Sequence, residues 1–475
     1  MLATGSQGSI DWSNIRCTVA GIGIAGFAAA EVLLERGANV CVVDDSDGPN
    51  QRERAEVLGI LGARVLLGES AQLLPSDLLV VSPGLRPDAP VIAEAQRRGI
   101  EVWGELELAW QLRGSDAPPW LLVTGTNGKT TATLMLASIL TAAGLRTTAA
   151  GNIGVSLVQV VTREALDVIA VEVGAPQLPF VTSMSPLAAA CLNIAEDHVD
   201  HFGSMPAYRA AKARVFHHAQ VAAVYNVDDP QTRQMVQDAD VCEGCRAVGF
   251  TLGIPQPGML GVVDDILVDR AFVENRVTSA QELATVADVR PQAPHNVANA
   301  LAAAALARAY GVEATAVRDG LREFVPAPHR ISTVATIGGV VYVDDSKATN
   351  AHAALTSLQA FDRVIWIAGG LAKGQRFEDL IDSVRDRLRG VVLLGRDREV
   401  IANALSELAP QVRVVEVSRA EPDAMHEVVA QAAALACSGD TVLLAPGCAS
   451  WDMYRDYAHR GDTFVQAVQS LAEAS

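Results

Sequence analysis

The segment VTGTNGKTT, from Val123 to Thr131, constrains the fold more than any other part of the chain. It lies between an apolar run that predicts a strand, Trp120 to Val123, and a run that predicts a helix, Thr130 to Ala143. Glycines in such a turn let backbone N–H groups approach phosphate oxygens, the lysine supplies a cation, and the next hydroxyl can ligate magnesium. The sequence therefore predicts a nucleotide-binding α/β domain.

The loop does not follow the strict spacing G-x-x-x-x-G-K-[ST], because Val123 occupies the position of the first glycine. It matches a shorter G-x-x-G-K-[ST] loop. An ordinary strand-to-helix turn with an exposed lysine is the alternative interpretation. The combination of strand, glycines, lysine and hydroxyl favours ATP as the ligand.

A second glycine-rich turn lies near the N-terminus. Gly21, Gly23 and Gly26 form G-x-G-x-x-G after one predicted strand, and Asp44 and Asp45 end the next. Such a turn can receive a phosphate while a carboxylate meets a hydroxyl, so it fits either a nicotinamide dinucleotide or a UDP-sugar. An NAD-dependent oxidoreductase would leave the loop at Gly125 unexplained.

Strand and helix signals alternate along the chain and are interrupted by proline-rich stretches at residues 116–119 and 326–328. A length of 475 residues favours three domains. We predict an α/β protein with an N-terminal Rossmann-like domain for a UDP-linked precursor (1–117), a central P-loop ATPase-type domain with a parallel sheet (118–326) and a C-terminal Rossmann-like domain for an amino acid (327–475).

Composition excludes several partners. A formal net charge of −18 argues against nucleic acid and anionic membrane surfaces. No apolar stretch is long enough to span a membrane, and the first residues do not resemble a signal peptide. The seven cysteines, an odd number, suit a reducing cytoplasm. We expect a cytoplasmic monomer, and we assign no zinc to the lone C-x-x-C of Cys242 and Cys245.

Segments spread over nearly the whole chain resemble the Mur ligases, which build bacterial cell-wall precursors. They are GTNGKTT at Gly125, SPG at Ser82, GNIG at Gly151, EDHVDHF at Glu196, YRAAKARVF at Tyr208, HNVANALAA at His295, PHR at Pro328, DDSKATNAHA at Asp344, AGGLAKG at Ala368 and APGCASWDMYRDYAHRG at Ala445. DDSKATN is the most discriminating, because relatives that add other amino acids have segments resembling DDYAH, DDYGHHP or DAYNANP there. Folylpolyglutamate synthases have one resembling DGAHNP. The resemblance therefore favours D-glutamate.

The resemblance implies an ATP-dependent amide ligase that adds D-glutamate to UDP-N-acetylmuramoyl-L-alanine. ATP would phosphorylate the terminal carboxylate, the amine of D-glutamate would attack the acyl phosphate, and ADP and phosphate would leave. A carboxylate is a poor acceptor for an amine, so its oxygen must first become a better leaving group. Two magnesium ions would neutralise the charge that gathers there.

The resemblance also implies a role for each matched residue. The catalytic residues would be Lys129, Glu172, His198 and Lys212, and the metal ligands would be Thr130, Glu172, His198 and Lys212. Lys212 would carry a carbamate, which replaces a cation by an anionic oxygen donor. From the residues alone, a surface lysine is the favoured interpretation of Lys212, and an ordinary residue at a strand end is the less favoured alternative for Glu172.

Three binding sets complete the prediction. The ATP set is Gly125, Thr126, Asn127, Gly128, Lys129, Thr130, Thr131, Asn296, Asn299, Arg330 and Asp345. The precursor set is Ile24, Ala25, Asp44, Asp45, Ser82, Pro83, Gly84, Asn152, Gln177 and His198. The D-glutamate set is Lys347, Thr349, Lys373, Ser450 and Tyr457. Arg330 follows the second linker, so it would reach ATP only on domain closure.

Three departures from the family pattern concern substrate contacts. The chain has EVGAPQL at Glu172 where the family often has ELSSFQL, Tyr457 in place of a phenylalanine, and Trp451 in place of a leucine.

Besides other amide ligases and an oxidoreductase, a non-catalytic nucleotide-binding module is a further alternative. The polar cluster from Asp344 to Asn350 argues against that module, because it supplies an acceptor site.

Overall fold

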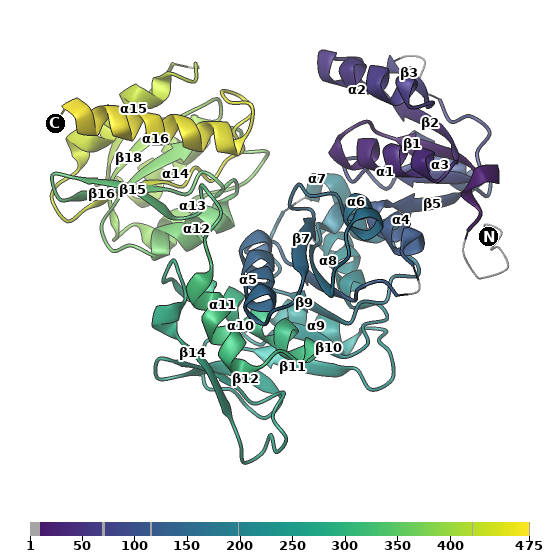
Figure 1. Ribbon diagram of the computed structural model, residues 1–475. Coiled ribbons are helices and arrows are strands. Elements are labelled where there is room, and N and C mark those ends of the chain that lie inside the picture. Colours follow the sequence, from purple (N-terminus) through teal and green to yellow (C-terminus); the bar gives the residue numbers. More distant parts are fainter. Residues whose placement is uncertain (1–9, 69–71, 115, 198, 420, 475) are drawn as a thin grey trace. The chain divides into compact units, whose positions relative to one another are not determined.

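The computed structural model describes residues 10–68, 72–114, 116–197, 199–419 and 421–474 (Figure 1). The chain forms two compact units, one of residues 1–289 and 296–324 and the other of residues 290–295 and 325–475. Three β-sheets are present, one within each segment for which we predicted a domain. The boundaries at 117 and 326 stay a prediction. Within the described ranges, no helix has both the length and the apolar character needed to cross a membrane.

The first sheet is parallel, as predicted for this segment. Its strand order is β3 (Arg64–Leu67), β2 (Asn39–Asp44), β1 (Arg16–Ala20), β4 (Leu78–Val81) and β5 (Glu101–Gly104). The helices of this region are η1 (Trp12–Asn14), α1 (Ile24–Glu35), α2 (Pro49–Ile60), α3 (Pro90–Arg97) and α4 (Glu105–Leu112). The chain moves outward from β1 on both sides, so the crevice expected of such a sheet lies at the carboxyl ends of β1 and β4.

Glycine is required where β1 turns into α1. Gly21 has a φ of +94°, and a Cβ on Gly26 would lie 1.8 Å from the carbonyl oxygen of Gly21. The helix begins at Ile24, and Gly23 serves as its N-cap. The turn therefore brings backbone N–H groups of the first helical residues to the crevice.

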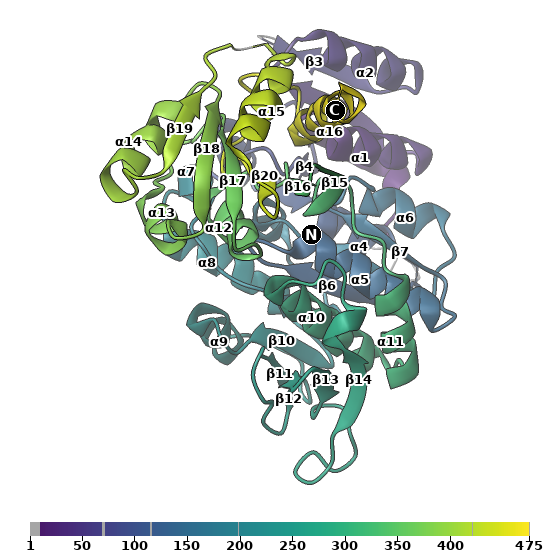
Figure 2. The same ribbon diagram turned by 90° about the vertical axis from the view of Figure 1, so that its left-hand side faces the viewer.

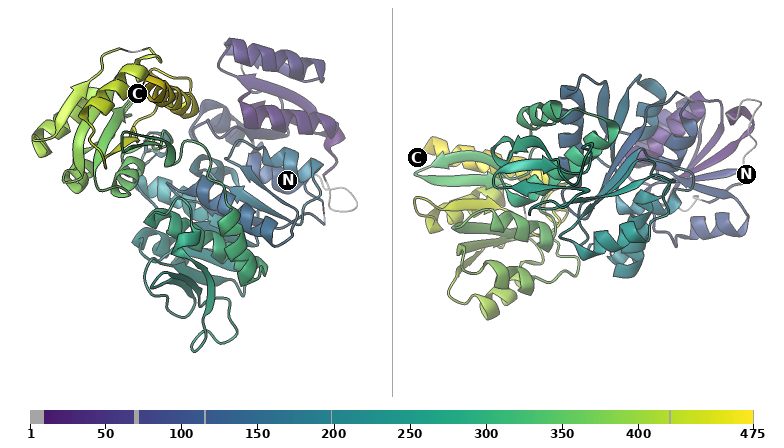
Figure 3. Two further views of the ribbon diagram at one scale, coloured as in Figure 1. Left: turned by 60° about the vertical axis from the view of Figure 1, so that its left-hand side comes forward. Right: turned by 90° about the horizontal axis from the view of Figure 1, so that it is seen from below.

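The central sheet has nine strands. Their order is β14 (Gln281–Thr285), β13 (Ile266–Asp269), β12 (Met259–Val263), β11 (Arg246–Phe250), β10 (Ala222–Asn226), β9 (Ala188–Cys191), β6 (Trp120–Thr124), β8 (Val168–Glu172) and β7 (Thr147–Gly151). Strands β12, β13 and β14 pair antiparallel and extend one end of the sheet (Figure 3). The prediction of a parallel sheet is correct for β6 to β11 and missed this antiparallel extension, whose strands are partly exposed.

Both faces of the central sheet are buried. Leu121 and Val123 of β6 pack with helices on one face, and Trp120 and Leu122 pack on the other, as the alternation of side chains along a strand requires. The helices are α5 (Lys129–Ala142), α6 (Leu157–Arg163), η3 (Ala175–Phe180), α7 (Val199–Phe202), α8 (Met205–Ala213), η4 (Arg214–Phe216), α9 (Pro230–Gln237), η5 (Val286–Asp288), α10 (Pro294–Tyr310) and α11 (Ala314–Glu323). Figure 2 shows α10 and α11 beside this sheet.

One hydrophobic core runs from the first sheet into the central one. It joins Val19 and Val80 of the first sheet to Leu106 of α4, Leu157 of α6 and Val171 of β8. Because the apolar surfaces of both sheets are buried in this shared core, the first two predicted domains form a single compact unit.

The third sheet is doubly wound, as predicted, except for an antiparallel edge strand. Its order is β15 (Ser332–Ile337), β16 (Val340–Asp344), β20 (Thr441–Leu444), β17 (Val364–Gly369), β18 (Leu388–Leu394) and β19 (Arg413–Glu416). Two buried clusters lie on its two faces. The helices that supply them are α12 (Ala351–Gln359), α13 (Glu378–Val384), α14 (Arg398–Leu408), α15 (Ala424–Leu435) and α16 (Tyr457–Ala474).

The substitution Gly26→Ala tests the turn between β1 and α1. The new methyl group would collide with the backbone of Gly21, so we expect a lower chemical-denaturation midpoint and a loss of about 1–3 kcal/mol. Gly23→Ala is the matched control, because a Cβ there meets no atom within 4 Å and the φ of −64° suits any residue. Equal midpoints for the two variants would contradict this explanation of the glycines.

Candidate active site

The phosphate loop joins β6 to α5 and is held by the end of the neighbouring strand β9. Gly125 and Gly128 have φ values of +154° and +83°, which only glycine adopts readily. The N–H of Thr126 donates to the carbonyl of Asn193 at 3.0 Å, and the N–H of Asn127 donates to the side-chain oxygen of Asn193 at 2.9 Å. These hydrogen bonds fix the loop at the N-terminus of α5, and helix N-termini are favourable sites for anions.

Lys129 lies over this loop. Its Nζ donates to the carbonyl oxygens of Gly125 and Thr126 at 3.1 and 2.9 Å. The cation therefore lies at the glycine turn, and its role in binding phosphate stays a prediction. Thr130 follows at the start of α5 and is partly exposed, whereas Thr131 is buried.

Glu172 ends β8 beside the loop and is 2% exposed. Its Oε1 accepts a hydrogen bond from the side-chain amide of Asn152 at 3.0 Å. Its Oε2 is buried and has no hydrogen-bond partner within the described residues. A buried carboxylate oxygen that lacks a partner is unfavourable by itself, and a cation would satisfy it.

Lys212 is fully buried rather than exposed on its helix. It is 1% exposed, and its Nζ donates to the carbonyl oxygen of Gly125 at 2.7 Å. Burial and, to a smaller extent, the charge of Lys129 together lower the pKa of Lys212 to about 7, against the opposing effects of Cys191, Asp197 and Glu172. This pKa is lower in the folded chain than in the unfolded one, so a protonated Lys212 destabilises the fold at low pH. The free energy of unfolding therefore increases as the pH rises from about 7 towards 10.5.

Tyr208 links Lys212 to the phosphate loop. Its hydroxyl lies 3.0 Å from Oγ1 of Thr126, and its ring centroid lies 5.0 Å from Nζ of Lys212. This tyrosine begins the segment YRAAKARVF, and no role was predicted for it. Its position in the helical turn before Lys212 was the signal available.

Of the two predicted ATP contacts on α10, Asn299 lies against the same loop and Asn296 contacts Asn299. A Cβ on Gly128 would come within 2.4 Å of Oδ1 of Asn299, and Asn299 donates to Oδ1 of Asn296 at 3.4 Å. Both asparagines are buried. The structure therefore brings Asn299 to the phosphate loop in unit one. His198 lies outside the described residues.

The crevice of the first sheet opens into a cavity of about 1260 Å³. The described residues of the predicted precursor set all line it: Ile24, Ala25, Asp44, Asp45, Ser82, Pro83, Gly84, Asn152 and Gln177. Asp44 orders the turn, because its carboxylate accepts from the N–H groups of Ile22 and Ser46 at 2.8 Å each. Residues far apart in the sequence thus share one cavity that reaches from the first sheet to the central one.

Glu105 also lines this cavity, and the sequence analysis did not identify it. Its Oε1 accepts from the hydroxyl of Ser156 at 2.9 Å and from the N–H of Leu157 at 3.0 Å. Burial raises the pKa of Glu105, and these hydrogen bonds oppose the shift. No motif marks this residue, so only its place in the fold identifies it.

The remaining predicted residues lie in the second unit, near the carboxyl ends of β16, β20 and β17. Nζ of Lys347 lies 3.9 Å from the ring centroid of Tyr457, and Nζ of Lys373 lies 4.1 Å from that of Trp451. Ser450 is buried, and Thr349 is partly buried. The structure therefore brings Lys347 next to Tyr457 and places Lys373 over the unusual Trp451.

Asp345 is buried in the same unit. Its carboxylate accepts hydrogen bonds from the hydroxyl of Ser357 and from the N–H of Ile331. Burial raises its pKa to about 6, against the effects of Ser357 and of the positive charge of Arg330. The predicted pair Arg330 and Asp345 is thus electrostatically linked within unit two.

Arg460 is a buried cation that the sequence analysis missed, although it lies in the quoted segment at Ala445. It is 1% exposed, and its guanidinium donates to the hydroxyl and carbonyl oxygens of Ser346 at 2.9 and 2.8 Å and to the carbonyl of Cys448 at 3.1 Å. Burial lowers its pKa to about 10, where the group is still charged at neutral pH. Arg460 thus holds together the two loops that carry Lys347 and Ser450.

Family models match three consecutive parts of the chain. They are the Mur ligase MurD-like N-terminal domain at residues 15–104, the Mur ligase middle domain at 123–307 and the Mur ligase glutamate ligase domain at 329–448. The chain belongs to the Mur ligase family. The family and the three-domain α/β fold predicted from the sequence are thereby confirmed.

Similarity to individual family members covers nearly the full length. The chain is 57% identical to the UDP-N-acetylmuramoylalanine--D-glutamate ligase of Streptomyces avermitilis over 97% of this chain and 99% of that protein. It is 52% identical to the enzyme of the same name from Thermobifida fusca, over 96% and 98% of the two chains. Among solved structures, the UDP-N-acetylmuramate-alanine ligase of Thermotoga maritima has the same fold, with a TM-score of 0.58, 20% identity and coverage of 96% and 100%.

Arg460→Lys tests whether the guanidinium orders the loops of the second unit. A lysine keeps the charge but cannot reach three acceptors in a planar arrangement, so we expect a loss of about 2 kcal/mol or more in a denaturant titration. Arg455→Lys, at an exposed position nearby, should leave the midpoint unchanged. A parent-like midpoint for Arg460→Lys would show that the loops are held by other contacts.

Proposed function

We propose that this chain is the ATP-dependent ligase that joins D-glutamate to UDP-N-acetylmuramoyl-L-alanine in peptidoglycan precursor synthesis. The observation that carries the proposal is 57% identity, over nearly the full length of both chains, to a ligase of that name. The segment DDSKATN at Asp344 supports the same amino acid. Other amide ligases, an oxidoreductase and a binding module account for fewer of these features.

The cavity of the first sheet is the proposed site of the UDP-linked precursor. The N-terminus of α1 lies at its edge, so the N–H groups of Ile24 and Ala25 can meet a diphosphate. Asn152 and Gln177 line the far part of the cavity, on elements of the central sheet. Asn152 also bonds Glu172, so the cavity leads toward the phosphate loop.

ATP is proposed to bind over Gly125 to Thr131, with Asn296 and Asn299 at the adenine and Arg330 and Asp345 reaching it on domain closure. The loop N–H groups and Lys129 would attract the phosphates. The γ-phosphoryl group would pass to the alanine carboxylate of the precursor. The acyl phosphate would then lose phosphate when the D-glutamate nitrogen attacks its carbonyl carbon.

Magnesium fits the residues of this site. Glu172 offers a buried carboxylate oxygen without a described partner, and Thr130 offers a hydroxyl at the start of α5. We propose these two, His198 and carbamylated Lys212 as ligands of two ions. When bound, magnesium would neutralise phosphate charge and polarise the reacting oxygens.

A carbamate on Lys212 is supported by its surroundings. The amine is buried and donates a hydrogen bond to the carbonyl oxygen of Gly125. The charges of Lys129 and Glu172 both change its pKa. Carbamylation requires an uncharged amine, and burial favours that form. The modification would turn a second cation into an anion beside Lys129, which removes a like-charge repulsion.

D-glutamate is proposed to bind at the carboxyl ends of β16, β17 and β20. Lys347 and Lys373 supply cations for two carboxylates, and Thr349, Ser450 and Tyr457 supply hydroxyls. We further propose that the protein acts as a cytoplasmic monomer and does not bind nucleic acid or membranes. The described cysteines are all unpaired, which suits that compartment.

A coupled assay of ADP release tests the function. We expect turnover only when UDP-N-acetylmuramoyl-L-alanine, ATP, magnesium and D-glutamate are all present, and no turnover when any one is omitted. L-glutamate, L-alanine, L-lysine and meso-diaminopimelate serve as matched alternatives to D-glutamate. Greater turnover with one of these, or reduction of a nicotinamide with no ADP release, would refute the proposed function.

Lys212→Ala tests the carbamate. We expect a loss of at least about 100-fold in kcat, because an anionic ligand is removed from the metal site, and partial recovery with acetate or another short carboxylic acid. In the parent enzyme, a ¹³C-bicarbonate carbamate signal should grow as the pH rises through about 7, where the buried amine loses its proton. Lys373→Ala, which keeps Lys212, should retain that signal. Full activity of unrescued Lys212→Ala would exclude the role.

A further inference from the structure

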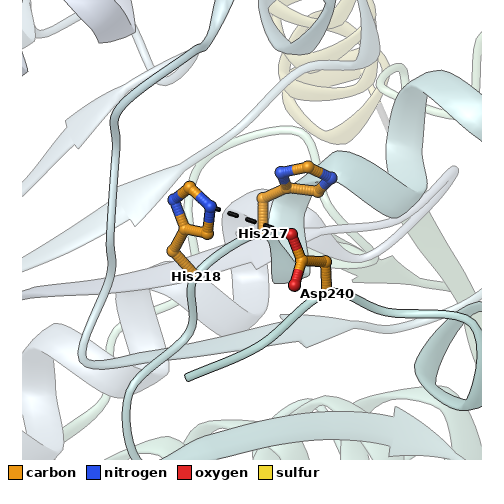
Figure 4. A group of neighbouring side chains, drawn as sticks. All are labelled: His217, His218 and Asp240. Atoms are coloured by element: carbon orange, nitrogen blue, oxygen red, sulfur yellow. Dashed lines mark ion pairs between the residues drawn. The ribbon is translucent and has the colours of Figure 1, made fainter. Parts of the chain in front are cut away.

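Three side chains that can ligate metals gather at the surface of the first unit, outside the site described above. His217 and His218 follow η4, and Asp240 lies in the loop between α9 and β11. Their ligand atoms all lie within 4.8 Å of one another. Figure 4 shows the ring of His218 facing the carboxylate of Asp240, with the ring of His217 beside them. Among the described residues, no other group of His, Cys, Asp and Glu meets this criterion.

Neighbouring residues in an extended chain point their side chains in opposite directions, so His217 and His218 would ordinarily diverge. The backbone of His218 has a φ of +53°, in the left-handed region that residues other than glycine rarely adopt. The two rings consequently lie 5.4 Å apart, centroid to centroid, at an angle of 48°. The unusual backbone conformation is what brings both imidazoles to one side.

This conformation is held by a set of hydrogen bonds. The N–H of His218 donates to the carbonyl oxygen of Asp240 at 2.8 Å. The carbonyl oxygen of His218 accepts from the hydroxyl of Ser185 at 2.7 Å and from the thiol of Cys242 at 3.3 Å. The backbone on both sides of the cluster is therefore fixed before any ligand arrives, so little ordering is needed for binding.

We propose that His217, His218 and Asp240 form a binding site for a divalent transition-metal ion such as Zn²⁺. Two imidazole nitrogens and one carboxylate oxygen suit zinc, cobalt or nickel, whereas magnesium prefers oxygen ligands alone. The Nε2 of His218 lies 3.9 Å from an oxygen of Asp240. Tetrahedral zinc bonds of about 2.0–2.1 Å require ligand atoms roughly 3.3 Å apart, so small side-chain rotations complete the site.

The site is open to solvent, which leaves the remaining coordination positions to water. The side chains of His218 and Asp240 are 42% and 74% exposed. A bound metal would link the loop after α9 to the segment after η4. The helix η4 directly follows α8, which carries Lys212. The expected consequence is a modest stabilisation of the folded chain by the metal.

Cobalt titration of the full-length protein tests the proposal. The protein is prepared without a polyhistidine tag, treated with a chelator and kept in excess magnesium, so that sites for hard cations are filled. We expect one equivalent of Co²⁺ with a visible d–d absorption band, and a rise in Tm with Zn²⁺. His217→Gln, His218→Asn and Asp240→Asn should each weaken Co²⁺ binding at least tenfold and abolish the rise in Tm.

The variants are chosen so that loss of binding is not loss of folding. Asparagine tolerates the left-handed backbone of His218, and each variant should match the parent Tm in chelator. His426→Ala, at an exposed histidine, and the double variant Cys242→Ser with Cys245→Ser should keep the parent affinity. Unchanged affinity in the three site variants, loss of binding only in the cysteine variant, or no saturable binding would each overturn the proposal.

Discussion

The contact between Lys212 and the carbonyl oxygen of Gly125 is the interaction around which the candidate site is organised. A buried ammonium group is unfavourable unless it is hydrogen-bonded or loses its proton, and the fold provides for both. Tyr208 adds a second link from the same helix to the phosphate loop through Thr126. The loop is thereby joined to α8 on one side and, through Asn193, to β9 on the other. A loop so fixed can present its N–H groups to a phosphate without further ordering.

The shared core of the first two sheets extends this rigidity to the cavity proposed for the precursor. Glu105 begins the helix that follows β5, yet its carboxylate accepts from Ser156 and Leu157 at the start of α6. This buried link crosses from the first predicted domain to the second. Asn152 then lies between the cavity and Glu172. The distance between a precursor in the cavity and the phosphate loop is therefore set by packed elements, which suits a reaction that depends on the placement of two substrates.

The sequence predicts the parts of the molecule in which local pattern and function coincide. The strand before the phosphate loop, predicted at Trp120 to Val123, spans Trp120–Thr124, because buried parallel strands are continuous apolar runs. The strands β12 to β14 were missed because they pair antiparallel and are partly exposed, unlike the buried parallel strands. Motifs identified Lys212, but only the fold reveals that it is buried. Glu105 and Arg460 act through contacts with residues distant in sequence, so no local pattern reveals them.

The segment EVGAPQL departs from the family pattern, and its turn is formed by hydrogen bonding and close packing that need no serine side chain. The side-chain oxygen of Gln177 accepts from the N–H of Gly174 at 2.8 Å, and a Cβ on Gly174 would come within 3.1 Å of Oδ1 of Asn152. These backbone contacts shape the turn after Glu172 without serine hydroxyls. Ala175 and Pro176 begin a short helix in which proline at the first turn is well tolerated. The turn therefore keeps Glu172 and Gln177 in place, and Gln177 still lines the cavity proposed for the precursor beside Asn152.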